Sequence, residues 1–403
     1  MVSDAFIYDT VRTPRGKGKK DGSLHEVTSL RLSEIVLRAI AERNNLDTKK
    51  VDDVILGCVM PIGENGADIA RSAVLAADYD ISVAGQQINR FCASGLEAIC
   101  QAAMRVQVGM AEFAIGGGVE SMSRVPMGSD GGAIAVDVTV AAKHGILPQG
   151  VAADLIATYY GFTRDQADAF AVRSHKRALS AQSQGRFDKS LIPVTDINNM
   201  LILERDEMIR PDCTVESLGK LNASFEMMGK NLGFDGIALQ KYPHLERINH
   251  IHTAGNSSAI VDGAAAVLVG SKAAGKSAGL IPKARIKAFA SVGSEPTMML
   301  SGPIDVTKKL LKKAKMSPSD IDIWELNEAF SSVVLMYMQE FNITDDQINV
   351  AGGAIAMGHP LGATGAMITG IVADELERRN LNTALIVLCV AAGMGTAMII
   401  ERV

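Results

Sequence analysis

The stretch Ile88-Asn89-Arg90-Phe91-Cys92-Ala93-Ser94-Gly95 places a turn of small residues between a short strand and a long helix. A second stretch repeats this arrangement, because Ile348-Asn349 precedes Gly362-Ala363-Thr364-Gly365. One internal duplication explains both stretches, and chance similarity among glycine-rich turns is the competing explanation. We therefore expect a chain built from two similar halves.

Segments with strand and helix periodicity alternate on both sides of these turns. In the first part we expect strands near 5–9, 54–58, 86–89 and 113–117, and helices near 27–44, 67–77 and 95–108. In the last part we expect strands near 284–290, 321–326, 349–350 and 384–388, and helices near 306–314, 329–341 and 365–378. This alternation predicts an α/β fold with helices layered on a central sheet.

The middle of the chain breaks this pattern. From about residue 121 to residue 252 it contains loops, a polar helix near 164–184 and few strand-like runs. We interpret this segment as a loop domain inserted into the first half, and we expect it to cover a face of that half. The predicted domains are an N-terminal half, residues 1–269, and a C-terminal half, residues 270–403.

Composition excludes several classes of protein. The 403 residues carry 40 basic and 45 acidic side chains, a net charge of −5, and aromatic residues make up 4%. This balance argues against nucleic-acid binding, which usually needs a basic face and often stacking aromatic residues. The 5 cysteines show no disulfide-scaffold or metal-finger spacing, so we expect free thiols and a cytoplasmic location.

No signal peptide and no membrane span are expected. The chain runs almost at once into the strand near 5–9, without the charged and apolar segments of a leader. Two uncharged stretches, 350–373 and 384–400, are interrupted by glycine. We expect both to be buried strand-loop-helix segments, because glycine-interrupted stretches of this kind fit a lipid-spanning helix poorly.

Cys92 is the first candidate for chemistry, because it lies just before the start of a helix. The positive end of the helix dipole and the exposed N–H groups there both favour the thiolate, the nucleophilic form of cysteine. A buried cysteine that acts only as a small hydrophobic side chain is the alternative.

Three further residues are candidates, each with a structural alternative. His359, in the apolar and glycine-rich stretch 352–362, would be a base for Cys92 if it lay within hydrogen-bond reach. Cys389 ends a strand before a glycine-containing turn, where backbone N–H groups can approach a ligand as an oxyanion hole requires. Asn327 follows a strand and opens a helix, where a helix N-cap is the alternative role.

Together these features resemble the thiolase family, and the resemblance runs from Tyr8 to the last strand. Its most specific parts are 89–95, 116–123, 327–330, 352–365 and 389–395, and the loops 253–258 and 262–265 match the pantetheine side of the family's site. Within the family, 123–130 and 238–252 look closest to the thiolase subunit of bacterial trifunctional fatty-acid β-oxidation complexes.

The resemblance implies a fold and a reaction. The fold would be two pseudo-symmetric βαβαβ-type halves in a five-layer α/β/α/β/α sandwich, with a loop domain over the active site. The activity would be that of a 3-ketoacyl-CoA thiolase, an acetyl-CoA C-acyltransferase of fatty-acid β-oxidation. It would use CoA to cleave 3-oxoacyl-CoA into acetyl-CoA and a shortened acyl-CoA.

The resemblance also implies a role for each candidate residue. Cys92 would attack the substrate and hold the acyl group, with His359 taking its proton. Cys389 would protonate the departing carbanion and later deprotonate the second CoA. Asn327, through a water, and His359 would stabilise the enolate oxygen, while the N–H groups of Cys92 and Ala391 would form the oxyanion hole.

Five more residues match positions that contact coenzyme A in the family. Arg210 and Ser217 would contact the adenine nucleotide, Ser258 would contact pantetheine, and Ala329 and Phe330 would form pocket walls. Coenzyme A is a substrate in this reaction, so the resemblance implies no bound cofactor and no metal.

The chain departs from the family pattern in two places. Ala391 and Ala392 stand where the family usually has glycine, and the oxyanion hole survives this change if φ at Ala391 is negative. In acetyl-specific thiolases a methionine of the covering loop limits the acyl pocket. Gly145 would stand at that place here, which predicts room for a longer acyl chain.

Other functions compete with this one. An acetoacetyl-CoA thiolase that condenses acetyl-CoA is the alternative within the enzyme class. A ketoacyl synthase on the same fold would lack the second cysteine, Cys389. A non-catalytic acyl-CoA or lipid-binding protein on this fold is the alternative of a different class. By resemblance we expect a homodimer or tetramer and a separate hydratase/dehydrogenase chain as partner.

Overall fold

The computed structural model describes residues 3–403, in which strands and helices alternate in both halves. The first half has β1 (Ala5–Arg12), β2 (Gly16–Lys17), β3 (Val51–Gly57), β4 (Ala84–Ile88), β5 (Phe113–Ser121) and β8 (Val261–Gly270), with α1 (Ser29–Arg43), α2 (Ile69–Ala76) and α3 (Ser94–Gln107). After α11 (Lys272–Ser277), the second half has β9 (Ala284–Gly293), β10 (Ile323–Leu326), β11 (Thr383–Val390) and β12 (Met394–Arg402), with α12 (Gly302–Ala314), α13 (Ser331–Phe341), α14 (Ala354–Met357) and α15 (Thr364–Arg379).

The strand order repeats from one half to the other. It is β4-β3-β5-β8-β1 in the first half and β10-β11-β12-β9 in the second. β3 and β5 are parallel and β5 and β8 antiparallel, just as β10 and β11 are parallel and β11 and β12 antiparallel. A short ladder between residues 5–7 of β1 and 284–286 of β9 joins the halves into one mixed sheet.

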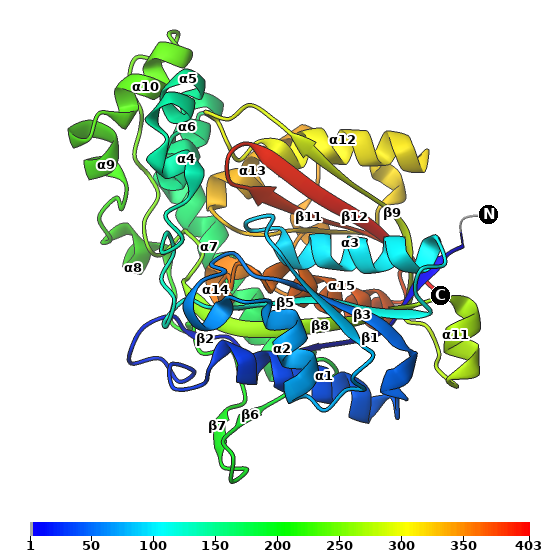
Figure 1. Cartoon of the computed structure of the whole chain (residues 1–403). Coiled ribbons are helices and arrows are strands. Elements are labelled where there is room, and N and C mark those ends of the chain that lie inside the picture. The colour runs from blue at the N-terminus through cyan, green and yellow to red at the C-terminus, as the bar shows by residue number, and fades with distance from the viewer. Residues whose placement is uncertain (1–2) are drawn as a thin grey trace.

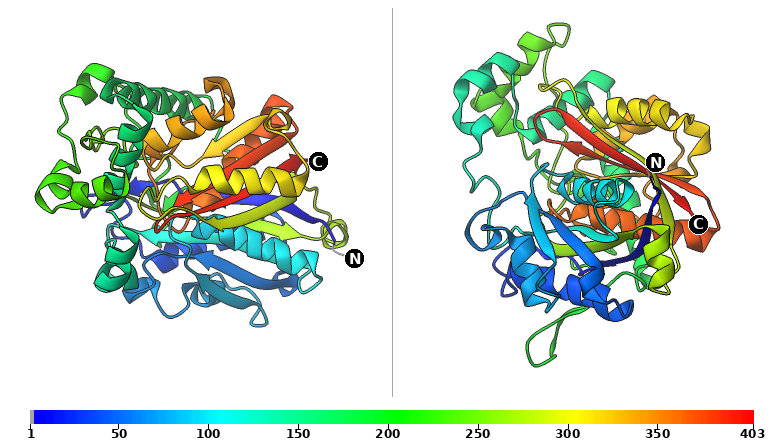
Figure 2. Two further views of the ribbon diagram at one scale, coloured as in Figure 1. Left: turned by 90° about the horizontal axis from the view of Figure 1, so that it is seen from above. Right: turned by 45° about the vertical axis from the view of Figure 1, so that its right-hand side comes forward.

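The helices form layers around and between the two parts of this sheet (Figure 1). α12 and α13 lie on the outer side of the second-half strands, and α1 and α2 lie on the outer side of the first-half strands. α3 and α15 lie between the two parts and pack on strands of both halves. The right-hand view of Figure 2 again shows α3, in cyan, in this central layer. The predicted five-layer α/β/α/β/α sandwich is therefore confirmed.

Glycines let the two central helices approach each other closely. A Cβ added to Gly95 in α3 would lie 2.7 Å from the carbonyl oxygen of Gly362, just ahead of α15. A Cβ added to Gly118 in β5 would collide with the same oxygen. A larger side chain at either position would push away the start of α15 and the loop before it, since interiors are close-packed. These glycines therefore hold the loop of His359 against the first half.

The strand predicted at 349–350 is wrong. An isolated parallel bridge joins Ile348 to Trp324, and Asn349 then takes a left-handed φ of 48° that ends the extended backbone. The side chain of Asn349 continues the pairing in place of a strand. Its Oδ1 accepts from the Leu326 N–H and its Nδ2 donates to the Leu326 carbonyl, both at 2.9 Å.

The strand-loop-helix arrangement predicted for 384–400 is also wrong. β11 and β12 form an antiparallel hairpin in which Val390 lies opposite Met394. The turn between them contains Ala392 at φ 63° and Gly393 at φ 73°, and two successive left-handed residues reverse the chain within a few positions. Apolar periodicity alone does not distinguish a buried strand from a buried helix in so short a run.

The segment between β5 and β8 contains small helices and one hairpin. Its elements are α4 (Ala133–Val136), α5 (Val138–His144), α6 (Gln149–Tyr160), α7 (Arg164–Ser183), β6 (Val194–Thr195), β7 (Leu201–Leu203), α8 (Val215–Gly219), α9 (Glu226–Asn231) and α10 (Phe234–Lys241). None of the helices formed by residues 3–403 is long and apolar enough to cross a membrane.

This inserted segment packs on both halves. We expected it to cover the first half, and residues of β6 and β7 do join the core of that half, but α6 and α7 lie against α13 and α14 of the second half. Leu155 and Ile156 of α6 are fully buried in one core with Val333 and Val334 of α13. Burial of this apolar face determines where the segment sits, and it brings the start of α6 toward the ends of the sheet strands.

Candidate active site

A strained turn presents Cys92 at the start of α3. Phe91 takes a left-handed φ of 45°, a conformation that is costly for a bulky residue and is often found at functional sites. Ser94 holds the turn: its hydroxyl accepts from the Arg90 N–H at 2.8 Å and donates to the Phe91 carbonyl at 2.6 Å. Asn89 anchors the turn to the loop after β3, since its Nδ2 donates to the Val59 carbonyl at 3.0 Å.

The environment of Cys92 favours the thiol. The residue is 5% exposed, and burial raises its pKa to about 11, although the side-chain amide of Gln149 and the Ala391 N–H pull the pKa down. The helix start alone favours the thiolate, but it does not set the protonation state of the buried Cys92. Desolvation of the charged sulfur outweighs the helix dipole, so a base must take the proton when Cys92 attacks.

This raised pKa predicts how the resting enzyme reacts with iodoacetamide. The thiolate is the reactive form, so below pH 11 the alkylation rate of Cys92 should rise about tenfold per pH unit. We expect no plateau when the rate is followed by peptide mass spectrometry between pH 6 and about pH 9. The Cys92→Ala variant shows the background from other thiols, and a plateau near neutral pH would contradict the account.

His359 is a neutral base paired with Asn327. Its Nδ1 lies 2.6 Å from the Thr364 hydroxyl, which donates its own proton to the Pro360 carbonyl at 3.0 Å. Thr364 therefore accepts from Nδ1–H, and Nε2 keeps its lone pair. Asn327 Nδ2 lies 3.3 Å from this Nε2. Burial, and then the charge of Arg15, lowers the pKa of His359 to about 3.

Cys389 and Ala391 lie where β11 ends. Cys389 is fully buried, and burial followed by the proximity of Cys92 raises its pKa. Ala391 lies outside the left-handed region and directs its N–H toward Cys92. Because φ at Ala391 is not in the left-handed region, its N–H can serve as an oxyanion-hole donor. The left-handed residue of this turn is Ala392.

The structure brings the four candidates together in two pairs. Asn327 bonds His359, and Cys92 lies beside both Ala391 and Cys389. Within residues 3–403, however, no hydrogen bond joins His359 to the sulfur of either cysteine. Catalytic contacts of this kind often tighten only when substrate binds.

Sequence reasoning missed two groups that touch these residues. Gln149, the first residue of α6, places its amide near Cys92, and no motif marked it. Thr364 sets the tautomer of His359, and its position five residues after His359 was the available signal. Both contacts arise only when distant segments or a helix start come together in the fold.

Glu120 is a buried carboxylate that ties the two halves together beside the site. It accepts from the N–H groups of Val59 at 2.9 Å, Met60 at 3.1 Å and Gly362 at 2.9 Å. Burial raises its pKa to about 7 despite these bonds. Because Gly362 follows His359 closely, Glu120 helps to hold the loop of His359.

The residues predicted to contact coenzyme A fall into two groups. Ser258, Ala329 and Phe330 lie together, since the Ser258 N–H donates to the Ala329 carbonyl at 2.9 Å and a bridge joins Ser257 to Phe330. Arg210 and Ser217 lie on the exposed side of the inserted segment, where the Ser217 hydroxyl donates to the Thr214 carbonyl at 2.8 Å. Their contacts with coenzyme A stay predictions. Residues 3–403 hold no group of three His, Cys, Asp or Glu side chains arranged for a metal.

Comparison with known sequence families decides the assignment. The pattern of the thiolase N-terminal domain matches residues 5–231, and that of the thiolase C-terminal domain matches residues 280–402. The chain belongs to the thiolase family. The predicted family and its acyltransferase class are thereby confirmed.

Individual thiolases match along the whole chain. The chain is 38% identical to a 3-oxoadipyl-CoA/3-oxo-5,6-dehydrosuberyl-CoA thiolase of Escherichia coli, and the match covers 100% of both. It is 37% identical to a 3-ketoacyl-CoA thiolase of Cronobacter sakazakii, again over 100% of both.

Solved thiolase structures are equally similar in fold. Human mitochondrial 3-ketoacyl-CoA thiolase matches with a TM-score of 0.85 and 30% identity over 100% of this chain and 99% of that one. Bacillus anthracis acetyl-CoA acetyltransferase matches with a TM-score of 0.86 and 33% identity over the same shares.

Proposed function

We propose that this thiolase is a 3-ketoacyl-CoA thiolase that cleaves 3-oxoacyl-CoA with coenzyme A in fatty-acid β-oxidation. One observation carries the proposal: the Ala391 N–H and Cys389 lie beside the Cys92 sulfur, while Asn327 lies 3.3 Å from the free Nε2 of His359. This arrangement provides a nucleophile, a second thiol and two separate sites for a negative oxygen.

In the first half-reaction the Cys92 sulfur attacks the C3 carbonyl of the substrate and His359 takes the thiol proton. The N–H groups of Cys92 and Ala391 stabilise the oxyanion. The C2–C3 bond then breaks, and the electron pair goes to the enolate of acetyl-CoA, whose oxygen faces His359 and Asn327. Cys389, held as a thiol by its raised pKa, protonates C2 and releases acetyl-CoA.

In the second half-reaction coenzyme A removes the acyl group. The Cys389 thiolate takes the proton of the incoming CoA thiol, and the CoA sulfur attacks the acyl-Cys92 thioester. Cys92 leaves as a thiolate and recovers its proton from His359. Cys389 gives one proton to acetyl-CoA and takes another from coenzyme A, while Cys92 recovers its proton from His359. Both thiols and the neutral histidine are then ready for the next turnover.

The main alternative is an acetoacetyl-CoA thiolase, because the same residues serve the condensation of two acetyl-CoA molecules. The 38% identical relative named above is a 3-oxoadipyl-CoA/3-oxo-5,6-dehydrosuberyl-CoA thiolase, and the 37% identical one is a 3-ketoacyl-CoA thiolase. Both names favour cleavage of substrates longer than acetoacetyl-CoA. The acetyl-CoA acetyltransferase structure is 33% identical. A non-catalytic binding protein is disfavoured, because Cys389 lies beside Cys92 and Asn327 lies beside His359.

The room for a longer acyl chain that we expected at Gly145 finds no support in the fold. Gly145 is the left-handed C-cap of α5 at φ 60°, and a Cβ there would meet Thr297 and Ile237 rather than Cys92. The residue of this loop that reaches Cys92 is Gln149. The proposed preference for longer chains therefore rests on the relatives and not on Gly145.

A thiolysis series tests the proposal. Rates with 3-oxoacyl-CoA substrates of four to about twelve carbons should rise with length, because each fully buried methylene contributes about 0.8 kcal/mol, or roughly fourfold in kcat/KM. Acetoacetyl-CoA should be the poorest substrate. Activity confined to acetoacetyl-CoA would contradict the 3-ketoacyl assignment and support the alternative.

We also propose a homodimer or tetramer in the cytoplasm, with a hydratase/dehydrogenase chain as partner in β-oxidation. β4 ends the sheet order, so its outer edge is open to another strand. Leu75 and Ile81, close to β4 in sequence, are 50% and 81% exposed. Both features suit pairing with a second copy, and a mass of at least two chains by light scattering is the result this proposal requires.

A further inference from the structure

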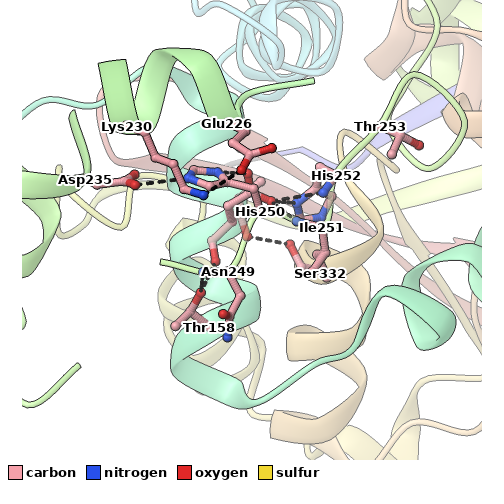
Figure 3. Close-up of polar contacts among 12 residues, drawn as sticks. Thr158, Glu226, Lys230, Asp235, Asn249, His250, Ile251, His252, Thr253 and Ser332 are labelled. Atoms are coloured by element: carbon pink, nitrogen blue, oxygen red, sulfur yellow. Dashed lines mark hydrogen bonds and ion pairs between the residues drawn. The ribbon is translucent and has the colours of Figure 1, made fainter. Parts of the chain in front are cut away.

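Two histidines near the end of the inserted segment share one buried carboxylate (Figure 3). Asp154, on α6, is fully buried and accepts from His250 Nδ1 at 2.8 Å and from His252 Nδ1 at 2.7 Å. It also accepts from the N–H groups of Ile251 and His252, both at 3.0 Å. On its other side, His250 Nε2 lies 3.1 Å from Asp235 of α10.

This network leaves one nitrogen of His252 without a partner. Because Asp154 can only accept, Nδ1 of His252 carries the proton, and in the neutral ring Nε2 is an acceptor. His252 is fully buried, and among residues 3–403 its Nε2 has no hydrogen-bond partner. A buried polar atom without a partner is rare and destabilising, so it needs an explanation.

His252 lies at the wall of the substrate site. Its ring packs edge-to-face on Phe330 with 5.4 Å between ring centres, and Phe330 follows Asn327 by three residues. Ser257, whose hydroxyl is also buried and has no partner in the described part of the chain, pairs with Phe330 through a backbone bridge. Two unpartnered polar atoms thus flank the predicted pocket wall.

Two segments connect His252 to residues beside Cys92 and His359: helix α6, through Asp154, and the loop that follows His252. Asp154 is five residues along α6 from Gln149, which reaches Cys92, and this spacing is about 7.5 Å along a helix axis. The chain after His252 continues to Ala259, whose carbonyl accepts from the His359 N–H at 2.9 Å. His252 is thus joined through α6 to the residue that reaches Cys92 and through the following loop to His359.

We propose that His252 Nε2 accepts a hydrogen bond from an N–H or O–H group of the bound CoA thioester, which makes His252 a specificity-determining residue. Asp154 is then a positioning residue that fixes the ring. The proposal rests on the proposed function. The donor is either an amide N–H of pantetheine, which every substrate carries, or a hydroxyl on the acyl chain.

Two substitutions of His252 distinguish a role in substrate binding from a purely structural role. In His252→Asn the side-chain amide still donates to Asp154, but no atom occupies the Nε2 position. In His252→Gln a polar atom returns near that position. We expect His252→Asn to raise KM by about two- to tenfold, the loss of one hydrogen bond, with kcat within about twofold. His252→Gln should restore most of the loss, and the exposed His244→Asn is the matched control that should leave KM unchanged.

The substrates distinguish the source of the donor. A rise in KM for both coenzyme A and 3-oxodecanoyl-CoA assigns the bond to pantetheine, and a rise confined to a 3-oxo-10-hydroxydecanoyl-CoA substrate assigns it to the acyl chain. An unchanged KM for all three substrates in folded His252→Asn would overturn the inference while leaving the proposed function intact. A wild-type enzyme without thiolysis would contradict the proposed function itself.

A measurement on the wild-type enzyme covers the case in which both variants misfold. In protein labelled with ¹⁵N-histidine, the Nε2 resonance of His252 should move when coenzyme A or 10-hydroxydecanoyl-CoA binds, because a new hydrogen bond changes the shielding of the lone-pair nitrogen. A resonance that neither compound moves would overturn the inference.

Discussion

Replacing Cys92 with alanine should reduce thiolysis by at least about 10⁴-fold, because the acyl group then has no sulfur to receive it. Intact-mass spectrometry after incubation with acetyl-CoA should show no acyl adduct. The fold should persist, since Ser94 and Asn89 hold the turn through bonds that do not involve the Cys92 side chain.

The control for this variant is another buried cysteine of the same helix. Cys100 lies in α3 at 3% exposure and has no place in the proposed reaction, so Cys100→Ala should keep its adduct and most of its activity. An acyl adduct that persists in Cys92→Ala would place the nucleophile elsewhere.

The Cys389→Ala variant should be blocked at a different step of the reaction. Carbon–carbon cleavage needs a proton carrier for C2, and loss of such a group typically costs about 10²- to 10⁴-fold. Transfer of a simple acyl group from acyl-CoA onto Cys92 forms no carbanion, so the adduct should still appear in this variant.

Exchange of the acetyl-CoA methyl protons with deuterated water isolates this role. Wild-type enzyme should incorporate deuterium, because Cys389 removes and returns a C2 proton, whereas Cys389→Ala should lose this exchange while keeping the adduct. Wild-type exchange or turnover in the variant would rule out the two-cysteine mechanism.

Much of the fold could be predicted because it repeats a local pattern. The turns before α3 and α15 are marked by small residues, and the alternating periods placed most strands and helices. The strand predicted at 349–350 is absent because the side-chain amide of Asn349, and not its backbone, pairs with Leu326. The β11–β12 hairpin was missed because a buried apolar run carries no period that separates strand from helix.

The candidate site was predictable only where its residues lie in recognisable turns. Cys92, Cys389 and Asn327 lie at strand ends or a helix start, and His359 lies in the glycine-rich loop between α14 and α15. Gln149 and the Asp154 network depend on where α6 packs against α13, which no local pattern encodes. The protonation state of Cys92 could not be predicted from its place at a helix start, because burial is a tertiary property and it outweighs the helix dipole.

The most direct test of the central claim follows one turnover in two stages. Wild-type enzyme mixed with 3-oxodecanoyl-CoA, without free coenzyme A, should release one equivalent of acetyl-CoA and carry an octanoyl group that peptide mapping places on Cys92. Added coenzyme A should then discharge it as octanoyl-CoA. An acyl group on any other residue, or consumption of the substrate with no acyl-enzyme formed, would contradict the account.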